Sequence, residues 1–338
     1  YAPALPVISR EFHVSSHAVK LSISIYLLGM TLPQLLLGPL SDTIGRKKII
    51  VTGLLVSLIG GAMCYDALGM TMLNTGRFIQ GLGAGAISLN ARAIARDVFG
   101  NKQLLKVFAF IGTAISVAPA LAPLIGGYLQ HEYGWRVMFF CMAGMLFLIW
   151  LLVQCFLPET NQNAEKKAFS VRITLNNYRR LCLTKSFVIN TLYGAMSFAI
   201  IMVYYTLSPH LLQVVYHMSV LHYSWSCVFV IVMLVLSRLL NVCLLRRLSS
   251  TRIILIGAAL IWLAALFLSL VSLSTHASIE IILLSTAFIM FGIGLIVGNV
   301  MARAFKEVRD LAGSAAALYG TMQIVICAIC TAIASHLP

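Results

Sequence analysis

Apolar runs of about 20 residues recur along almost the whole of this chain. A helix of that length crosses the ~30 Å hydrocarbon core of a bilayer, because each residue adds about 1.5 Å. We predict full spans at 18–39, 49–68, 71–94, 104–129, 136–157, 186–208, 221–245, 252–274, 278–301 and 312–335. The opening stretch YAPALPVI is expected to be the outer end of a first span, and no span is expected after residue 335.

The composition agrees with a chain that lies mostly in lipid. Hydrophobic residues make up 60% of the sequence and charged residues only 10%, and the mean hydropathy is +0.94. A soluble domain has about a quarter of its residues charged, so this chain cannot cover itself with a water-facing surface. The bilayer core accepts apolar side chains and rejects charge. We therefore predict an all-α membrane protein.

The basic residues are distributed unevenly, and their distribution sets the expected orientation. The formal net charge is +14, from 24 Lys and Arg against 10 Asp and Glu. Most of these cations fall in segments on one side of the membrane, namely Arg46, Lys47, Lys48, Arg92, Arg96, Lys102, Lys106, Lys166, Lys167, Arg172, Arg179, Arg180, Lys185, Arg246, Arg247, Arg252, Arg303, Lys306 and Arg309. Positive charge stays in the cytoplasm during insertion, so this is the inner side. The asymmetry explains the net charge without a nucleic-acid partner.

The longest polar stretch, 158–185, divides the chain into two halves. Residues 1–157 hold the end of span 1 and spans 2–6, and residues 186–338 hold spans 7–11. A basic turn follows the second span of each half. Two six-helix halves around a central loop are the layout of parallel-repeat transporters, which bind substrate between the halves near the middle of the membrane.

The stretch GPLSDTIGRKK forms a tight inner turn between two spans. Gly38 and Gly45 permit close approach and unusual dihedral angles, while Arg46 and Lys47 fix the topology. Asp42 needs another explanation. Its carboxylate can bond to a helix N-terminus or an arginine in one conformation and release it in another. A loop that only sets topology is the alternative interpretation.

This turn resembles the signature loop of the major facilitator superfamily. LNTGRFIQGLGAG (Leu73–Gly85) is similar to the fourth-span motif of that family, with Arg77 as its arginine, and GTAISVAPALAPLIGGYL (Gly112–Leu129) to the fifth-span motif of drug–proton antiporters. The matching residues of the fifth span are Pro119, Pro123, Gly126 and Gly127. RAIARDVF, YAPALP and LPET together resemble the bicyclomycin/chloramphenicol-resistance (Bcr/CflA) branch of bacterial multidrug exporters.

The resemblance implies a major facilitator fold and a function. It predicts a monomeric exporter, in a bacterial inner membrane, of small and largely apolar organic compounds. Export would proceed by alternating access in exchange for protons, with no cofactor, no metal and no enzyme activity. The fifth span would help to seal the cavity, whereas without the resemblance ordinary tight packing of a kinked helix is the favoured explanation of its prolines and glycines. The resemblance places the proton-coupling acid before Tyr1, where it would pair with Arg77.

Arg77 is the most informative single residue. It lies 15 residues before Arg92, about 22 Å along a helix, and therefore in the outer half of its span. A charge inside the membrane is a functional candidate, with snorkelling to the outer surface as the alternative. For Arg238, which is close to the inner boundary, snorkelling is favoured. Further polar residues within spans either line the cavity or form interhelical hydrogen bonds; they are Tyr26, Gln34, Gln80, Tyr204, Asn299 and Gln323.

Two other functions remain open at this stage. All ten acidic residues fall in loops or at span ends, which together with Arg77 allows an exporter of organic anions such as a carboxylate siderophore. The eight histidines all fall at the outer side and allow a membrane sensor. His13 and His17, four residues apart, are the best case for two histidines on one helix face.

Cys327 and Cys330 form a C-x-x-C in an apolar span. Packing as small apolar side chains is favoured there over a redox or metal role.

Overall fold

The computed structural model describes residues 1–99, 107, 121–160, 171–274, 278–306, 308 and 311–336. For a few of these it describes the backbone alone, namely 35, 36, 38–43, 92, 93, 96, 97, 171–174, 274, 312 and 313.

All regular structure in the described residues is helical, as predicted. The helices are the 3-10 helix η1 (Ala2–Ala4), α1 (Leu5–Glu11), α2 (Ser16–Ile44), α3 (Arg46–Tyr65), α4 (Met70–Val98), α6 (Trp135–Phe156), α7 (Val171–Leu183), α8 (Lys185–Pro209), the π-helix η3 (His210–Val215), α9 (Val220–Leu244), α10 (Ser250–Ser274), α11 (Ile279–Lys306) and α12 (Ala312–Ser335). Residues 121–133 are also helical. In this part of the chain, seven helices are long and apolar enough to cross a membrane.

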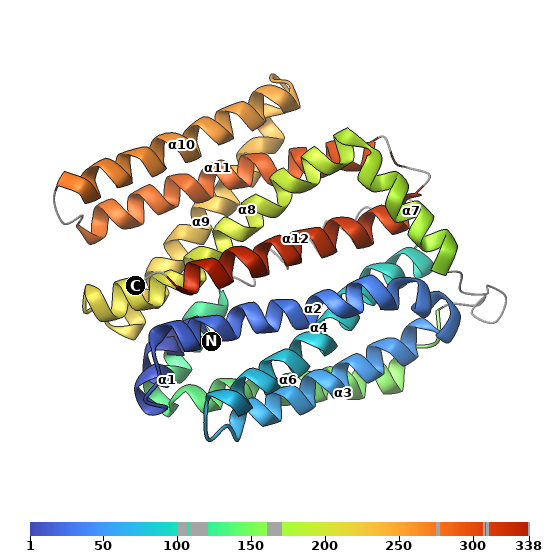
Figure 1. The fold of residues 1–338 in the computed structure, drawn as a ribbon, viewed down its shortest axis with the longest axis horizontal. Coiled ribbons are helices and arrows are strands. Elements are labelled where there is room, and N and C mark those ends of the chain that lie inside the picture. The colour runs from blue at the N-terminus through green and yellow to red at the C-terminus, as the bar shows by residue number, and fades with distance from the viewer. Residues whose placement is uncertain are drawn as a thin grey trace.

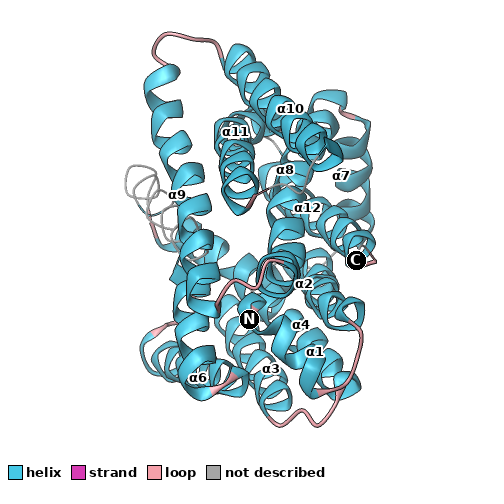
Figure 2. Cartoon of the chain, turned by 90° about the vertical axis from the view of Figure 1, so that its left-hand side faces the viewer, coloured by secondary structure: helices cyan, strands magenta, loops and turns pink. Residues whose placement is uncertain are grey.

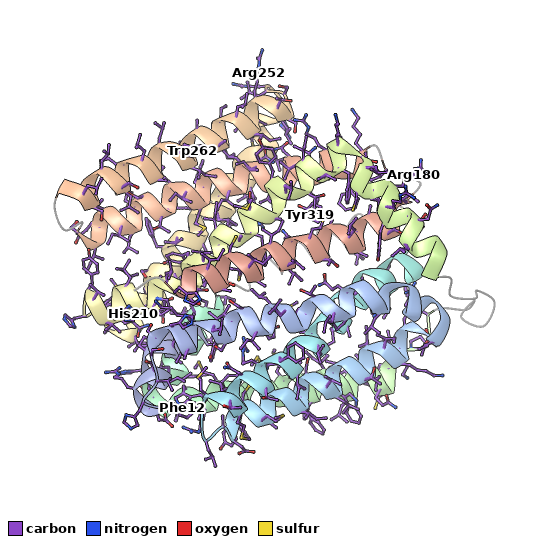
Figure 3. All side chains as sticks on the ribbon, viewed as in Figure 1. Phe12, Arg180, His210, Arg252, Trp262 and Tyr319 are labelled. Carbon is purple, nitrogen blue, oxygen red and sulfur yellow. The ribbon has the colours of Figure 1, made fainter. Side chains whose placement is uncertain are left out.

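The predicted spans coincide with these helices. Spans 18–39 and 71–94 lie within α2 and α4, each 29 residues long. The span predicted at 104–129 lies largely outside the described residues, and its described end extends to residue 133. α6 and α10 expose most of their apolar side chains, including Trp262, which is 76% exposed on α10 (Figure 3). Such faces suit lipid and would be unstable in water.

Glycines with positive φ mark two of the sharp turns between helices. Gly45 has φ +109° and separates α2 from α3, and Gly134 has φ +81° and precedes α6. A residue with a Cβ atom rarely adopts these angles, so glycine allows the chain to reverse with almost no loop. The turn predicted at Gly45 is therefore present.

The helices form two groups, one below the other in Figure 1. In the lower group α2 and α3 pack on α4, and α6 packs on α3. In the upper group α8, α9 and α10 pack on α11, and α12 packs on α8. Figure 2 shows α2 and α12 facing each other in the middle, and this pair makes the main contact between the groups.

The contact between α2 and α12 includes hydrogen bonds at the outer end of both helices. The hydroxyls of Ser24 and Thr331 lie 2.8 Å apart, and Oγ of Ser335 lies 3.1 Å from Nδ1 of His17. A buried apolar cluster continues the contact and includes Val19, Ile23, Leu27, Ile324, Cys327 and Ala328. The two halves are therefore joined at the outer side. Figure 3 shows His210 and Phe12 at this end and Arg180 at the opposite end.

The central polar stretch contains a helix, α7, which we did not predict from the sequence. Its Leu181 is fully buried and packs with Phe187, Val308 and Tyr319 at the inner end of the second half. Most of its other described side chains are exposed, and they include both polar residues and leucines. A short helix with one narrow apolar face gives little hydrophobic signal in a sequence, and the surrounding polar residues concealed it.

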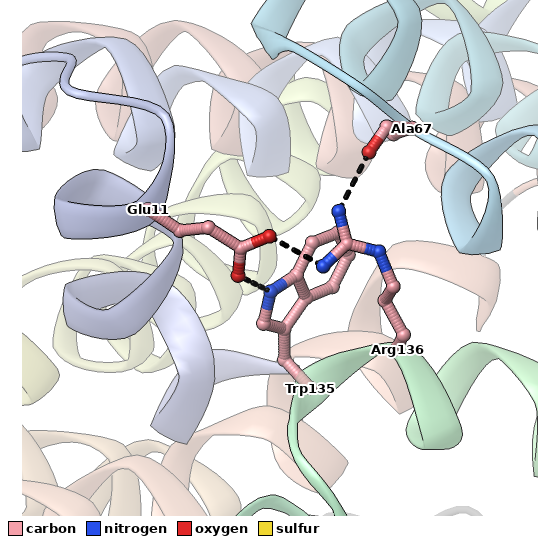
Figure 4. A network of polar contacts seen from close by, with 4 residues as sticks. All are labelled: Glu11, Ala67, Trp135 and Arg136. Carbon is pink, nitrogen blue, oxygen red and sulfur yellow. Dashed lines mark hydrogen bonds and ion pairs between the residues drawn. The ribbon is translucent and has the colours of Figure 1, made fainter.

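An outer network ties α1 to α6 and to the turn after α3 (Figure 4). Nε1 of Trp135 donates a 2.6 Å hydrogen bond to Glu11, and Arg136 pairs with the same carboxylate. Nη2 of Arg136 also donates to the carbonyl of Ala67 at 2.9 Å. Partial burial acts to raise the pKa of Glu11, but the hydrogen bonds from Trp135 and Arg136 outweigh it and hold the pKa below its ordinary value.

We predict that Glu11→Gln lowers the melting temperature at pH 7 by about 2 °C, because the charge-assisted pair is lost. The pKa of Glu11 is lower in the folded than in the unfolded protein. Its contribution is therefore complete above the unfolded pKa of about 4.5 and is lost as the pH falls through the folded value. The melting temperatures of wild type and variant in the same detergent should converge as the pH falls below 4.5 and through the folded pKa of Glu11.

Glu132→Gln is the matched control for this prediction. Glu132 is an exposed outer carboxylate whose Oε1 lies 3.9 Å from Nε2 of the neighbouring His131. Its removal should leave the melting temperature unchanged. Equal effects of the two substitutions at pH 7 would show that the Glu11 network does not stabilise the outer end.

Candidate functional site

Arg77 lies buried on α4, with 8% of its surface exposed. Its Nη1 donates a 2.6 Å hydrogen bond to Oε1 of Gln80, one turn further along the helix. Its Cζ atom lies 4.3 Å from the ring centre of Tyr26 on α2 and 4.6 Å from that of Tyr1. Aromatic ring faces attract a cation at this range. Nε of Arg77 is buried and has no hydrogen-bond partner in the described part of the chain.

The structure thus brings together three of the residues that we selected from sequence: Arg77, Gln80 and Tyr26. The alternative of snorkelling is wrong for Arg77, since two aromatic rings enclose the guanidinium within the bundle. Gln80 also reaches α6, where its Nε2 lies 3.8 Å from Sδ of Met142. A fixed, buried cation with one unsatisfied donor suits binding of a carboxylate or another acceptor.

Gln34 lies at the boundary between the halves. Its Nε2 donates to Oγ of Ser88 on α4 at 3.3 Å. A Cβ atom at Gly320 on α12 would come within 3.0 Å of its Oε1. Gln34 is therefore a polar contact on the surface where the two halves meet.

The remaining selected residues make contacts within the second half. Asn299 is 4% exposed, and its Nδ2 donates to Oδ1 of Asn241 on α9 at 2.8 Å. For Asn299 the structure thus favours the interhelical hydrogen bond over a cavity role. Tyr204 on α8 places its hydroxyl 3.9 Å from Sγ of Cys227. Nε2 of Gln323 donates a long 3.5 Å bond to the carbonyl of Gly194.

The inner turn at Gly45 is held by a carboxylate that we did not select as a site residue. Glu159 accepts hydrogen bonds from the backbone amides of Arg46 at 2.8 Å and Lys47 at 3.2 Å. Nζ of Lys47 donates to the carbonyl of Gln154 at 2.9 Å. The first amides of a helix lack partners within it and carry a partial positive charge, so a carboxylate stabilises the start of α3.

For Gly38 and Asp42 the structure describes the backbone alone, so the expected contact of the Asp42 carboxylate stays a prediction. The sequence signal for Glu159 was its place in LPET, directly after a span and on the same inner side as the turn. We had used LPET only for its family resemblance.

The fifth-span motif brings the two halves into contact. Pro119 lies outside the described residues, whereas Pro123, Gly126 and Gly127 lie in the helix at 121–133. A Cβ atom at Gly127 would overlap Oγ of Ser224 on α9. At Gly126 it would come within 3.3 Å of Sδ of Met138 on α6. Gly127 therefore allows the first half to approach α9 of the second half closely.

His13 and His17, the best case for two histidines on one helix face, lie in different segments, because His13 is in the turn before α2. His17 lies against His336 on the other half, with ring centres 4.0 Å apart, rather than sharing a ligand with His13. No group of three His, Cys, Asp or Glu in the described residues could hold a metal ion. A cleft of about 730 Å³ opens between the outer ends of α9 and α11, lined by Trp225 and Glu280 among others. Two of the outer histidines, His217 and His222, line this cleft, whereas none of the residues selected for the central cavity does.

We predict that Gly127→Val weakens the outer closure, because the added side chain would overlap Ser224. Cys227 lies one turn beyond Ser224 on α9 and is fully buried, so its accessibility to a thiol reagent reports whether the outer side is closed. Its labelling by a membrane-impermeant maleimide applied from outside should increase about fivefold or more in the variant. Gly144→Val is the control, since a Cβ atom at Gly144 meets no described atom within 4 Å. Unchanged labelling in Gly127→Val would contradict the assigned contact.

Comparison with known proteins identifies the family. The Major Facilitator Superfamily matches residues 1–330. A "Bicyclomycin resistance protein homolog" of Haemophilus influenzae is 25% identical over 329 residues, which is 97% of this chain and 82% of that protein. A "Multidrug resistance protein MdtL" of Shewanella oneidensis is 29% identical over 330 residues, with the same coverage of 97% and 82%.

Solved structures of low sequence identity share the fold. A D-xylose–proton symporter superposes with a TM-score of 0.77 at 16% identity, over 99% of this chain and 86% of that one. A bacterial homologue of the human lysosomal transporter Spinster, solved in an inward-facing conformation, superposes with a TM-score of 0.74 at 15% identity. The match covers 98% of this chain and 76% of that one. The chain belongs to the major facilitator superfamily of membrane transporters, and its predicted resemblance to the bicyclomycin-resistance branch is confirmed.

Proposed function

We propose that the protein is a secondary active exporter of small, largely apolar organic compounds, driven by exchange for protons. The names of its relatives, bicyclomycin resistance and multidrug resistance, support the direction and the substrate class. The bacterial origin of these relatives and the basic inner segments support the bacterial inner membrane. Both halves come from one chain, 1–157 and 186–338 with 158–185 between them, so a monomer suffices.

The observation that carries this proposal is the buried guanidinium of Arg77. Burial of an unpaired charge is costly, so the site favours a ligand or side chain that supplies negative charge or acceptors. From the family resemblance we propose that the coupling acid lies on the first span. The contact between Arg77 and the ring of Tyr1 supports this, because it shows that the first span lies beside the cation. Protonation of that acid and substrate binding would then exclude each other.

The contacts between the halves support alternating access. Three of them lie at the outer side, between Ser24 and Thr331, His17 and Ser335, and residues 127 and 224. We propose that these contacts form when the cavity faces inward and break when it faces outward. The Asp42 turn would make the corresponding contact at the inner side in the opposite state.

Export of an organic anion is the second candidate, and the unpaired Nε of Arg77 favours it. A fixed guanidinium binds carboxylates through paired hydrogen bonds. Uptake of a lipophilic cation and of an aromatic carboxylate into inverted vesicles separates the two functions. Transport of the cation alone supports proton-coupled drug export, and transport of the carboxylate alone supports the second candidate.

We predict that Arg77→Gln lowers drug efflux from an exporter-deficient bacterium at least about tenfold, because breaking a buried charge interaction costs several kcal/mol. Efflux by the wild-type protein should stop when a proton uncoupler is added. Arg77→Lys keeps the charge but loses the planar group between the rings, and should retain part of the activity.

Arg238→Gln is the control, because it also removes an arginine from a span. Arg238 lies closer to the inner boundary than Arg77 does. Membrane levels of all variants are measured by immunoblot. Full, uncoupler-sensitive efflux by Arg77→Gln at normal membrane levels would contradict the proposed role of Arg77.

A further inference from the structure

Helix α7 lies across the inner end of the bundle, whereas α8 and α12 run along it (Figure 1). It ends at Leu183, and the membrane-spanning helix α8 begins at Lys185 with one residue between them. Because α8 enters the bilayer from this end, α7 lies at the level of the inner lipid headgroups. Its buried face is occupied by Leu181 and Tyr178, which pack on the second half.

The opposite face of α7 combines exposed leucines with an arginine. Leu175 is 66% exposed and Leu183 is 73% exposed. Arg179 is also exposed and lies between them, and the spacing of four residues places all three on one stripe. Arg180 and Lys185 add positive charge beside this stripe. The sequence of α7 contains no Asp or Glu.

These features fit the surface of a membrane better than water. Exposed leucines are unfavourable in the cytoplasm but favourable at the boundary between headgroups and acyl chains. Arginine has a planar group that matches phosphate geometry and a long apolar stem that lets it reach the headgroup from that depth. The cytoplasmic leaflet carries negative charge, which complements this basic stripe.

We propose that α7 is a docking surface for anionic phospholipids of the inner leaflet. Leu175 and Leu183 insert among the first methylene groups, and Arg179 binds a lipid phosphate. Because Leu181 fixes α7 to the second half, bound lipid anchors the inner end of that half at the membrane surface.

The test uses the full-length protein in nanodiscs, with Cys182 as its only cysteine and a fluorescent label on that residue. Cys182 is exposed and adjoins the stripe. Spin-labelled phosphatidylglycerol or spin-labelled phosphatidylcholine is added at the same mole fraction to the same lipid mixture, and quenching is compared. We expect the anionic lipid to quench about twofold more than the zwitterionic one.

Two variants and a control make the test specific. Arg179→Glu should bring the quenching ratio to about one, since it repels the anionic lipid. Leu175→Ser with Leu183→Ser should reduce quenching by both lipids, because the stripe no longer inserts. Arg246→Glu makes the same charge change at an exposed residue between α9 and α10, and should leave the ratio unchanged.

Several outcomes would overturn the proposal. A ratio of about one between quenching by the anionic and by the zwitterionic lipid, in the labelled protein without further substitutions, would mean that α7 does not select anionic lipid. An equal loss of the ratio in Arg246→Glu would mean that only the overall charge matters. Strong quenching by aqueous iodide with none by either lipid would show that the stripe faces the cytoplasm, as expected for a site that binds a soluble protein.

Discussion

Hydrocarbon offers no hydrogen bonds, and this constraint decides where each polar group in the structure lies. Arg77 is enclosed by two aromatic rings and the Gln80 amide, and Asn299 is paired with Asn241. Each contact joins groups that would be costly to bury alone. Charge that cannot be paired in this way lies at the ends of the helices. Glu11 and Glu159 are such charges, and each ties together segments that are far apart in sequence.

The contacts within each half differ in kind from those between the halves. Within the first half, small residues allow α2, α3 and α4 to approach closely, and the Glu11 and Glu159 carboxylates fix both ends. Between the halves, the hydrogen bond of Ser24 with Thr331 joins two neutral hydroxyls. Neutral hydrogen bonds in membranes contribute little, about 0.6 kcal/mol on average. Ionic contacts within a half, and neutral hydrogen bonds with apolar packing between the halves, suit rocking about a central site.

Much of the fold was predictable because the bilayer imposes a length and a charge pattern on every span. The apolar runs identified α2 and α8–α12, and Gly45 correctly marked a turn. The sequence did not reveal α7, since its apolar face is narrow and a polar stretch surrounds it. Arg77 was found because an arginine in an apolar span is conspicuous. Glu159 was missed as a site residue because its partners are backbone amides of a helix more than 100 residues away, and backbone groups leave no mark in a sequence. From the sequence, Asn299 could line the cavity or form an interhelical hydrogen bond. Only the position of Asn241 in the structure favours the hydrogen bond.

The central claim is that substrate and protons exclude each other at the group that pairs with Arg77. The most direct measurement is the release of protons when a transported drug is added to purified full-length protein in weakly buffered detergent solution. The account predicts proton release that is saturable in drug and absent in Arg77→Gln, together with tighter drug binding as the pH rises. Saturable drug binding with no proton release at any pH would contradict it.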